Sequence, residues 1–495
     1  MSVLPDHEVV IVGAGFSGIG VAIALDRAGF HDFVLLEEGS GVGGAWHWNT
    51  YPGVAVDIPS FSYQFSFDRR ADWSRTYAPG AELKKYAESC TDKYALRDRI
   101  VFETRVTGAV FDEQADVWRL STEGGVEYTA RHVVSATGIL TKPKPPAIAG
   151  VSSFAGTVMH TARWDHGVDL AGKRVAIIGT GASAVQVIPS IAPEVEHLVV
   201  FQRTPIWCLP KPDAPLPSPA RIAMKYLPGA KSATRLLSQI FVEATFPIPA
   251  HFAGTLPIAR LAEPLGRAFL RQQVADPVVR EKLTPRYALG CKRPSASNDY
   301  LRTFNRGNVA LETTTIDSIT PRGVRTVDGV DHDVDVLILA TGFKVFESGN
   351  TPPFPVSGLG GLDLEAWWDD NRYQSYHGVS VPGFPNMFTI LGPYGYNGSS
   401  YFNLIETQAR HILRCLTEAR RTSATRVEVT AQANDEYMAT MRSRRSNQVF
   451  FQGGCDGANS YYFDKHGDVP FRPALTLETI WESATFDLDD YTYQR

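Results

Sequence analysis

The stretch Glu8-Val-Val-Ile-Val-Gly13-Ala-Gly15-Phe-Ser-Gly18 decides the fold expected for this chain. Its continuous apolar run is typical of a strand buried in a parallel sheet. The glycines follow the G-x-G-x-x-G spacing, and residues 19–28 then read as a helix. In this pattern Gly13 makes the tight turn, Gly15 lets the backbone approach a pyrophosphate and Gly18 allows close helix–strand packing. The helix N-terminus would offer N–H groups to the phosphates.

A second strand and an acid complete the unit. Residues 33–36 read as a strand that leads into Glu37, about 20 residues beyond the third glycine, where a carboxylate can bind a ribose diol. A glycine-rich turn can also serve packing alone. Because strand, turn, helix, strand and acid follow in register, the pattern predicts a dinucleotide site.

The pattern returns later in the chain with one informative difference. After the strand 174–178 comes Gly179-Thr-Gly181-Ala-Ser-Ala184, in which alanine at the third small position is an accepted variant. Arg203 follows Gly179 by 24 residues, the same spacing as from Gly13 to Glu37. An acid there would repel a 2′-phosphate, whereas an arginine binds one bidentately. The second site should therefore hold NADPH, with Thr204 assisting, and the first a dinucleotide without a 2′-phosphate.

The two units define the expected architecture. Each continues to a strand that ends in Ala-Thr-Gly, at 136–138 and again at 340–342, and the proline-rich residues 142–146 form a stiff connector. The predicted fold class is α/β, with two Rossmann-like dinucleotide-binding domains and a helical insertion in the second. The predicted division is 1–145 with 384–495 for the first domain, 150–204 with 291–383 for the second, 205–290 for the insertion and 141–172 for the interdomain linker.

The insertion reads as helices broken by prolines, with apolar faces. It is expected to form a lid over a substrate pocket, and a role at a membrane surface is an open alternative. It ends beside Lys292 and Arg293, which are either a solvated basic pair or part of a site.

Between the first two strands and the connector lies an aromatic loop, residues 43–60. Such a loop in a compact domain commonly wraps a ligand or covers a planar surface. Asp57 stands out because a carboxylate among aromatic side chains needs a partner, although it could instead cap the turn before Pro59.

Composition narrows the class of protein. Of 495 residues, 44% are hydrophobic and 20% charged, as in ordinary globular proteins, and the net charge of −5 gives no basic field for nucleic acid. Five scattered cysteines without C-x-x-C pairs argue against a disulfide framework, a zinc site or a dithiol redox centre. The N-terminus leaves no room for a signal peptide, and no apolar run is long enough for an integral membrane segment. We expect a cytoplasmic enzyme; its oligomeric state is not encoded in any motif.

The stretch Phe154-x-Gly156-x-x-x-His160-x-x-x-Trp164-Asp165 resembles the fingerprint of the type I Baeyer–Villiger monooxygenases, which are class B flavoprotein monooxygenases. The loop 43–57 resembles that family's second signature, and the resemblance covers the whole chain in order. It implies FAD in the first site, NADPH in the second, O2 as cosubstrate and a small-molecule ketone as substrate. The implied reaction inserts one oxygen beside the carbonyl through a C4a-peroxyflavin and gives an ester or lactone.

Carried over residue by residue, the resemblance assigns the catalytic arginine to Arg293 and the acid that orients it to Asp57. Two positions depart from the family pattern: Thr50 stands where an arginine is common, and Tyr461 where a tryptophan is common in the C-terminal loop, at the substrate pocket or NADPH. The implied binding residues are Gly13, Gly15, Gly18 and Glu37 for FAD, and Gly179, Gly181, Ala184, Arg203, Thr204 and Lys292 for NADPH. Further expected cofactor contacts are Gly44, Trp46, Tyr51, Asp57 and Asn397.

His160 is expected to organise the meeting of the two domains and not to act as a chemical base.

Three other classes of protein are alternatives to a Baeyer–Villiger monooxygenase. The nearest rival is a flavin-containing monooxygenase that oxidises the sulfur or nitrogen of small molecules. A disulfide reductase would need paired cysteines, and a flavin-binding sensor would not need both Arg203 and Arg293.

Overall fold

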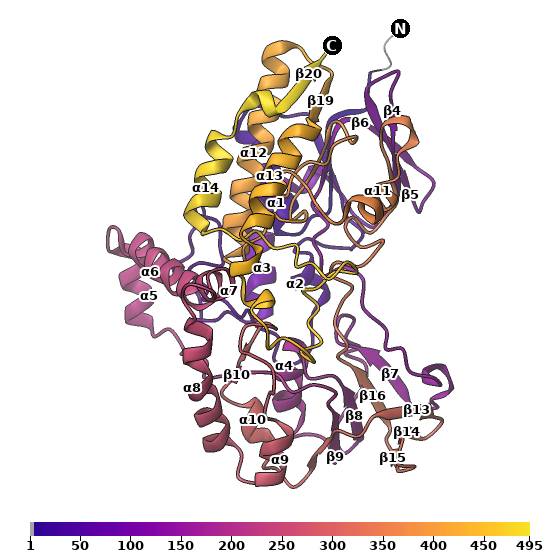
Figure 1. The fold of residues 1–495 in the computed structure, drawn as a ribbon, viewed down its shortest axis with the longest axis vertical. Coiled ribbons are helices and arrows are strands. Elements are labelled where there is room, and N and C mark those ends of the chain that lie inside the picture. Colours follow the sequence, from indigo (N-terminus) through magenta and orange to yellow (C-terminus); the bar gives the residue numbers. More distant parts are fainter. Residues whose placement is uncertain (1–3) are drawn as a thin grey trace.

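The computed structural model describes residues 4–495, whose two α/β domains lie one above the other along the long axis of the molecule (Figure 1). The first sheet has the strand order β17-β4-β5-β6-β1-β2-β3, with β18 also paired to β6. Its strands are β1 (His7–Val12), β2 (Phe33–Leu36), β3 (Ile100–Val101), β4 (Val106–Asp112), β5 (Val117–Thr122), β6 (Glu127–Ser135), β17 (Val356–Ser357) and β18 (Met387–Thr389).

Strand β1 lies at the centre of the parallel part of this sheet. Val9 pairs with Phe33 of β2 on one side and with His132 of β6 on the other, both in parallel register. Val9, Val10 and Ile11 are fully buried, which explains why the run is apolar on both faces. The remaining strands β4 and β5 form an antiparallel extension of β6.

Helices cover this sheet, and α1 packs directly against α12. Helix α12 begins at Tyr401, and its apolar stripe is buried in the largest hydrophobic cluster. The helices of this domain are α1 (Phe16–Arg27), α2 (Ala45–Trp48), α3 (Gly80–Lys93), α11 (Leu364–Asn371), α12 (Tyr401–Thr422), α13 (Ala431–Ser443) and α14 (Thr476–Thr485).

The second sheet is wholly parallel, in the order β12-β9-β8-β16-β7. Its strands are β7 (Thr157–His160), β8 (Arg174–Ile178), β9 (His197–Phe201), β12 (Val309–Glu312) and β16 (Val336–Leu339), with α4 (Ala182–Ile191) and α10 (Tyr300–Thr303) beside them. Strand β7 lies within the range 150–204 assigned to the second domain as well as within the linker range 141–172, and it pairs with β16 at the sheet edge.

The insertion is helical, as predicted. It consists of α5 (Ser218–Tyr226), α6 (Ala230–Thr245), α7 (Pro247–His251), α8 (Ile258–Gln273) and α9 (Pro277–Lys282). Helices α5 and α6 project from one side of the molecule (Figure 1). Smaller pairings complete the chain: β10 (Cys208–Leu209) with β11 (Ser295–Ala296), β13 (Ile316–Thr320) with β14 (Gly323–Thr326) and β15 (Asp331–Asp333), and β19 (Arg426–Val429) with β20 (Tyr491–Gln494).

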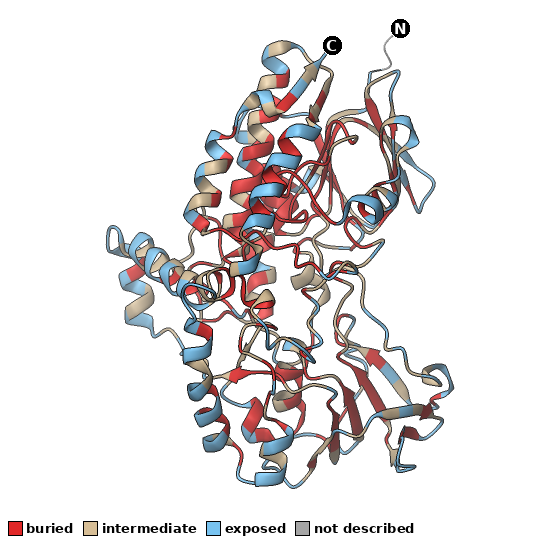
Figure 2. Cartoon of the chain, in the orientation of Figure 1, coloured by how far each residue is buried: buried red, intermediate tan, exposed pale blue. Residues whose placement is uncertain are grey.

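Each sheet has a core of its own. The buried residues concentrate in the two sheets and their flanking helices, while the projecting helices are largely exposed (Figure 2). No helix among residues 4–495 is long and apolar enough to cross a membrane.

One prediction about the cysteines is wrong. Cys291 and Cys455 form a disulfide with their Cα atoms 5.2 Å apart, although 164 residues separate them. Their spacing in sequence carries no signal, because the pairing depends on the C-terminal loop returning to the start of the Lys292–Arg293 segment. The other three cysteines are free and buried.

Candidate active site between two dinucleotide-binding turns

The first glycine turn has the geometry that close packing requires. Gly13 has φ of +104°, and a Cβ on Gly18 would lie 1.9 Å from the carbonyl oxygen of Gly13. The N–H of Ile19 donates to the carbonyl of Gly15, so the first turn of α1 begins directly at the glycines. A side chain on Gly18 would therefore push the helix off the strand.

Glu37 is held at the end of β2 by the same turn. Its carboxylate accepts from the N–H groups of Ala14 at 2.6 Å and Gly39 at 2.8 Å. Burial raises the pKa of Glu37, and these two N–H groups act in the opposite direction by stabilising its charged form. The carboxylate lines the cleft described next, where it can accept from hydroxyl groups of a ribose.

A cleft of about 530 Å³ runs from this turn to the interface with the second domain. Its wall includes the aromatic loop, where the indole N–H of Trp46 donates to Tyr63. A Cβ on Gly44 would lie 3.0 Å from the Cα of Gly15, so the loop and the turn touch through backbone. Several of the residues predicted from the sequence line this cleft: Gly13, Gly15, Glu37, Gly44, Trp46, Asp57, Arg293 and Tyr461.

Asp57 and Arg293 meet in the wall of this cleft. The Nε of Arg293 donates to Oδ2 of Asp57 at 2.7 Å, although 236 residues separate them. Burial disfavours the charge on Arg293, but Asp57 together with the side chains of Tyr462, Tyr396 and Tyr461 favours it, and the pKa of Arg293 lies well above its usual value. Arg293 therefore presents a fixed cation to the cleft, and Asp57 fixes its orientation.

The second glycine turn repeats the first at the end of β8. Gly179 has φ of +113°, and a Cβ there would lie 2.4 Å from the carbonyl oxygen of Ala340. A Cβ on Gly181 would meet no atom within 4 Å, so the space above this glycine is open to a ligand. Ala184 is fully buried where its small side chain packs against the domain core.

Cations gather beyond the end of β9. Arg203 is exposed at this position, and burial, followed by the charge of Arg203, lowers the pKa of Lys292. Thr204 accepts a hydrogen bond from the side chain of Asn459 at 2.7 Å. An anion between the two cations would stabilise the charge of Lys292, and a 2′-phosphate is an anion of this kind.

His160 of the fingerprint stretch joins two strand ends of the second sheet. His160 ends β7, where its Nδ1 accepts from the N–H of Ala162 at 3.0 Å and its Nε2 lies 3.3 Å from Thr341 Oγ1. Burial, and then the charge of Arg163, lowers the pKa of His160. A neutral ring in this position joins the end of β7 to the Ala-Thr-Gly turn after β16.

The other fingerprint residues support this strand and its neighbours. Phe154 is buried beside the second sheet, and a Cβ on Gly156 would lie 2.4 Å from the carbonyl oxygen of Asp335. Trp164 packs against the core of the second domain, and Asp165 accepts from the N–H of Gly167 at 2.8 Å. None of the five belongs to the lining of the cleft.

Two predicted cofactor contacts lie elsewhere. Asn397 does not line the cleft, and its side chain holds Ala474, Thr476 and Ser399 instead. Tyr51 donates to Gln186 of α4 at 3.0 Å and so ties the first domain to the second. Both side chains are thus engaged within the protein, and their contact with a cofactor stays a prediction.

Three residues that line the cleft or lie beside it were not predicted from the sequence. Arg163 lines the cleft and stacks on Trp48 at 3.9 Å, and Tyr396 lines the cleft near Arg293. Phe246, the residue after α6, places its ring 5.3 Å from the guanidinium carbon of Arg293. The only available signal was for Arg163, which belongs to the fingerprint stretch.

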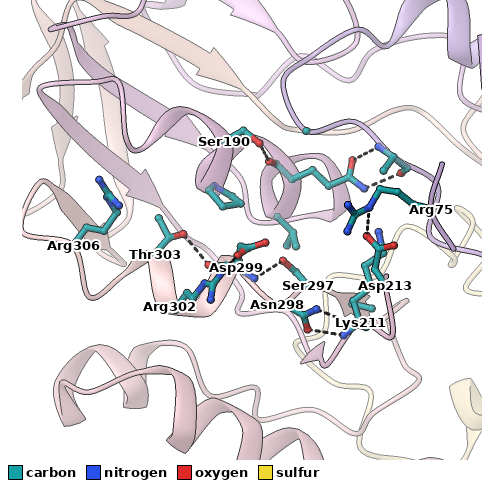
Figure 3. Close-up of a pocket in the computed structure, with 16 residues that line it drawn as sticks. Arg75, Ser190, Lys211, Asp213, Ser297, Asn298, Asp299, Arg302, Thr303 and Arg306 are labelled. Carbon is teal, nitrogen blue, oxygen red and sulfur yellow. Dashed lines mark hydrogen bonds and ion pairs between the residues drawn. The ribbon is translucent and has the colours of Figure 1, made fainter. Parts of the chain in front are cut away.

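A second cavity of about 560 Å³ lies between the first domain and helices α4 and α10 (Figure 3). Its wall contains Arg75, whose Nε donates to Asp213 at 3.1 Å, and Arg302, which pairs with Asp299. It shares no lining residue with the first cleft. Because Arg75 and Arg302 are already paired and neither glycine-rich turn lines it, this cavity is the weaker candidate for a cofactor.

These features define a flavoprotein-type oxidoreductase with two dinucleotide sites, and comparisons with known proteins give the class. The pyridine nucleotide-disulphide oxidoreductase family matches residues 10–213. A Baeyer-Villiger monooxygenase of Pseudomonas aeruginosa is 36% identical over 451 residues, 90% of this chain and 84% of that protein. A phenazine N-monooxygenase of Lysobacter antibioticus is 34% identical over 507 residues, 92% of each chain.

Among solved structures, OTEMO in complex with FAD and NADP superposes with a TM-score of 0.87 at 27% identity over 99% of each chain. The chain belongs to the Baeyer–Villiger monooxygenase family. The predicted family, fold class, enzyme class and cofactor pair are thereby confirmed.

Proposed function

We propose that this chain catalyses an NADPH- and O2-dependent Baeyer–Villiger oxidation, and that the residues described above are its active site. In this reaction a ketone, O2, NADPH and a proton give an ester or lactone, NADP⁺ and water. Bound FAD supplies the activation of O2. The observation that carries the proposal is the Arg293–Asp57 pair in the wall of a cleft that begins at the first glycine turn.

The role of Arg293 follows from its charge. Attack on a ketone carbonyl requires a deprotonated oxygen nucleophile and places negative charge on the carbonyl oxygen, and a fixed cation favours both. A guanidinium cannot deliver its proton at neutral pH, so it keeps this charge throughout. Asp57 holds the planar group in one orientation, at the cost of partly neutralising it.

The second domain would bind NADPH through a charge match. Arg203 and Lys292 supply cations for the 2′-phosphate, and Thr204 supplies a hydroxyl. The open space above Gly181 allows the pyrophosphate to approach the N-terminus of α4. The same residues leave NADH, which lacks the 2′-phosphate, without a partner for the two cations.

The substrate side of the cleft is aromatic. Tyr396, Tyr461, Tyr462 and Phe471 line it beside Arg293, and Phe246 lies over the guanidinium. Such a wall suits a largely apolar ketone. We place the enzyme in the cytoplasm.

Oxidation of nitrogen or sulfur is the second candidate, favoured by the similarity to a phenazine N-monooxygenase. One experiment separates the two: purified protein with NADPH and O2 is given a ketone panel, an aryl sulfide and an N-heteroarene, and the products are identified by mass. The proposal expects esters or lactones as main products. Products limited to sulfoxides or N-oxides would overturn it.

A further inference from the structure

The apolar surface of this molecule is unevenly distributed. Of 22 exposed large apolar side chains among residues 4–495, 11 lie within residues 218–273, about a ninth of the chain. They occupy α5, α6, α8 and the connections between them. These residues are Ile222, Tyr226, Leu227, Leu236, Leu237, Ile240, Phe241, Leu256, Ile258, Leu261 and Leu265, and we call them the apolar surface.

Helix α6 has its apolar stripe on the outside. Leu236, Leu237, Ile240 and Phe241 recur at helical spacing, and each is between 42% and 68% exposed. In a globular protein a stripe with this spacing normally faces the core. Here it faces solvent along a helix that projects from the molecule (Figures 1 and 2).

The opposite face of α6 explains this inversion, because it docks on the first domain through polar groups. Arg235 donates to the carbonyl of Gln64 at 2.7 Å and to Asn403 at 3.0 Å. Ser238 bonds to Ser62 at 2.9 Å, and Gln239 donates to Ser399 at 2.7 Å. These bonds fix the rotation of the helix, so the outward apolar stripe is a built feature of the fold.

The charges around the apolar surface are mostly positive. Residues 218–273 carry seven Lys and Arg and two Glu, which is a net charge of +5 on a chain of net charge −5. Both glutamates point inward: Glu243 accepts from Thr476, and Glu263 accepts from the N–H of Leu289. The cations Lys225, Arg260, Arg267 and Arg271 are exposed.

We propose that α5, α6 and α8 seat this protein on an anionic lipid bilayer, lying in the interface without spanning it. Outward Leu, Ile and Phe side chains flanked by Lys and Arg are what an interfacial helix presents to acyl chains and acidic headgroups. A second copy of the chain fits less well, because a twofold contact would place the same net positive surface against itself.

The apolar surface reaches the candidate site through one residue. Helix α6 ends at Thr245, and Phe246 after it covers the guanidinium of Arg293. If the proposed function holds, on which this step alone rests, an apolar ketone dissolved in the bilayer would enter the cleft beside Phe246. Anionic vesicles should then lower KM for a long-chain ketone and leave KM for a short, water-soluble ketone unchanged.

Vesicle flotation tests membrane binding without any turnover. The flavin-loaded full-length protein is mixed with vesicles of pure phosphatidylcholine or of phosphatidylcholine with about a quarter phosphatidylglycerol. We expect flotation with the anionic vesicles and weaker flotation at high salt. The variant Leu237→Ser/Ile240→Ser/Phe241→Ser should partition about a hundredfold less.

Matched controls make the result specific. Val110→Ser/Val126→Ser/Val330→Ser removes side chains of similar exposure from other surfaces and should float like the wild type. Lys225→Gln/Arg260→Gln/Arg271→Gln should lose about fivefold per cation on anionic vesicles. Thermal unfolding of each variant verifies that it is folded.

Three results would overturn the proposal. The wild type could remain unbound to both vesicle types, or both serine triples could lose flotation equally. The third is a wild-type dimer in sedimentation that the Leu237/Ile240/Phe241 variant converts to monomer without any vesicle binding, which would assign the apolar surface to a second copy.

Discussion

Replacing Arg293 by alanine tests the chemistry of the candidate site most directly. The guanidinium Nε lies 2.7 Å from Asp57 Oδ2, so removing Arg293 leaves that carboxylate without its cation. The local charge then changes from neutral to negative where the reaction places negative charge on oxygen. A unit charge about 4 Å away contributes ~4 kcal/mol at an effective dielectric constant of ~20.

That energy corresponds to about a thousandfold in rate. We therefore expect Arg293→Ala to form ester about a thousandfold more slowly while NADPH still bleaches the flavin absorbance. NADPH oxidation should then yield hydrogen peroxide in place of ester, because the reduced cofactor still reacts with O2. Arg293→Lys keeps the charge and loses the planar donors, so an intermediate loss is expected.

The assay measures ester by mass and NADPH oxidation by absorbance in the same reaction. Arg75→Ala is the matched control, because Arg75 also pairs with an aspartate, at 3.1 Å, yet lies in the other cavity. An ester yield per NADPH within about tenfold of wild type in Arg293→Ala would refute the assignment of Arg293.

Three further predictions follow from the structure. Arg203→Gln should raise KM for NADPH by about 10- to 100-fold, the loss of a charged hydrogen bond, and leave KM for NADH within about twofold; an equal rise for both cofactors in steady-state kinetics would contradict the role of Arg203. Burial lowers the pKa of His132 to about 3. Because the unfolded chain takes up this proton near pH 6.5 and the folded chain does not, stability should fall as pH drops below 6.5, by ~2 kcal/mol at pH 5 from this residue. Urea unfolding at pH 7 and pH 5 should show a smaller difference in His132→Gln than in wild type, and an unchanged difference would disprove it. Cys455→Ser should lower the free energy of unfolding by ~2–4 kcal/mol, since the disulfide closes a loop of 164 residues; a dithiol reductant should destabilise the wild type equally and leave the variant unaffected, whereas equal effects on both proteins would exclude the disulfide as the cause.

Several parts of the site could be predicted because their cause is local. A tight turn, a close helix–strand contact and an acid at fixed spacing are set by backbone geometry within about 30 residues, so the local geometry of Gly13, Gly18, Glu37 and Gly179 follows from spacing, while the role of Arg203 stays a prediction. The fingerprint likewise named the family, since it preserves an order of residues along one short stretch.

The tertiary structure alone decided which distant groups meet. Asp57 and Arg293 come from two domains, and no periodicity in the sequence measures their 2.7 Å contact. The Cys291–Cys455 disulfide likewise joins two residues that are far apart in the sequence and meet only in the folded chain. Asn397 lies in a glycine-rich turn that resembles a ligand-binding loop in sequence. In the folded chain its side chain instead donates hydrogen bonds to Ala474 and Thr476.

Helix α6 shows most clearly what the sequence determines by itself and what only the tertiary structure decides. Its sequence determined an amphipathic helix, because apolar residues recur every three to four positions. The side of the helix that faces the protein was decided by Arg235 and Ser238, whose partners lie more than 160 residues away. Helical periodicity is local and can be read in one window, whereas the rotation of a helix depends on packing partners that only the folded chain brings together.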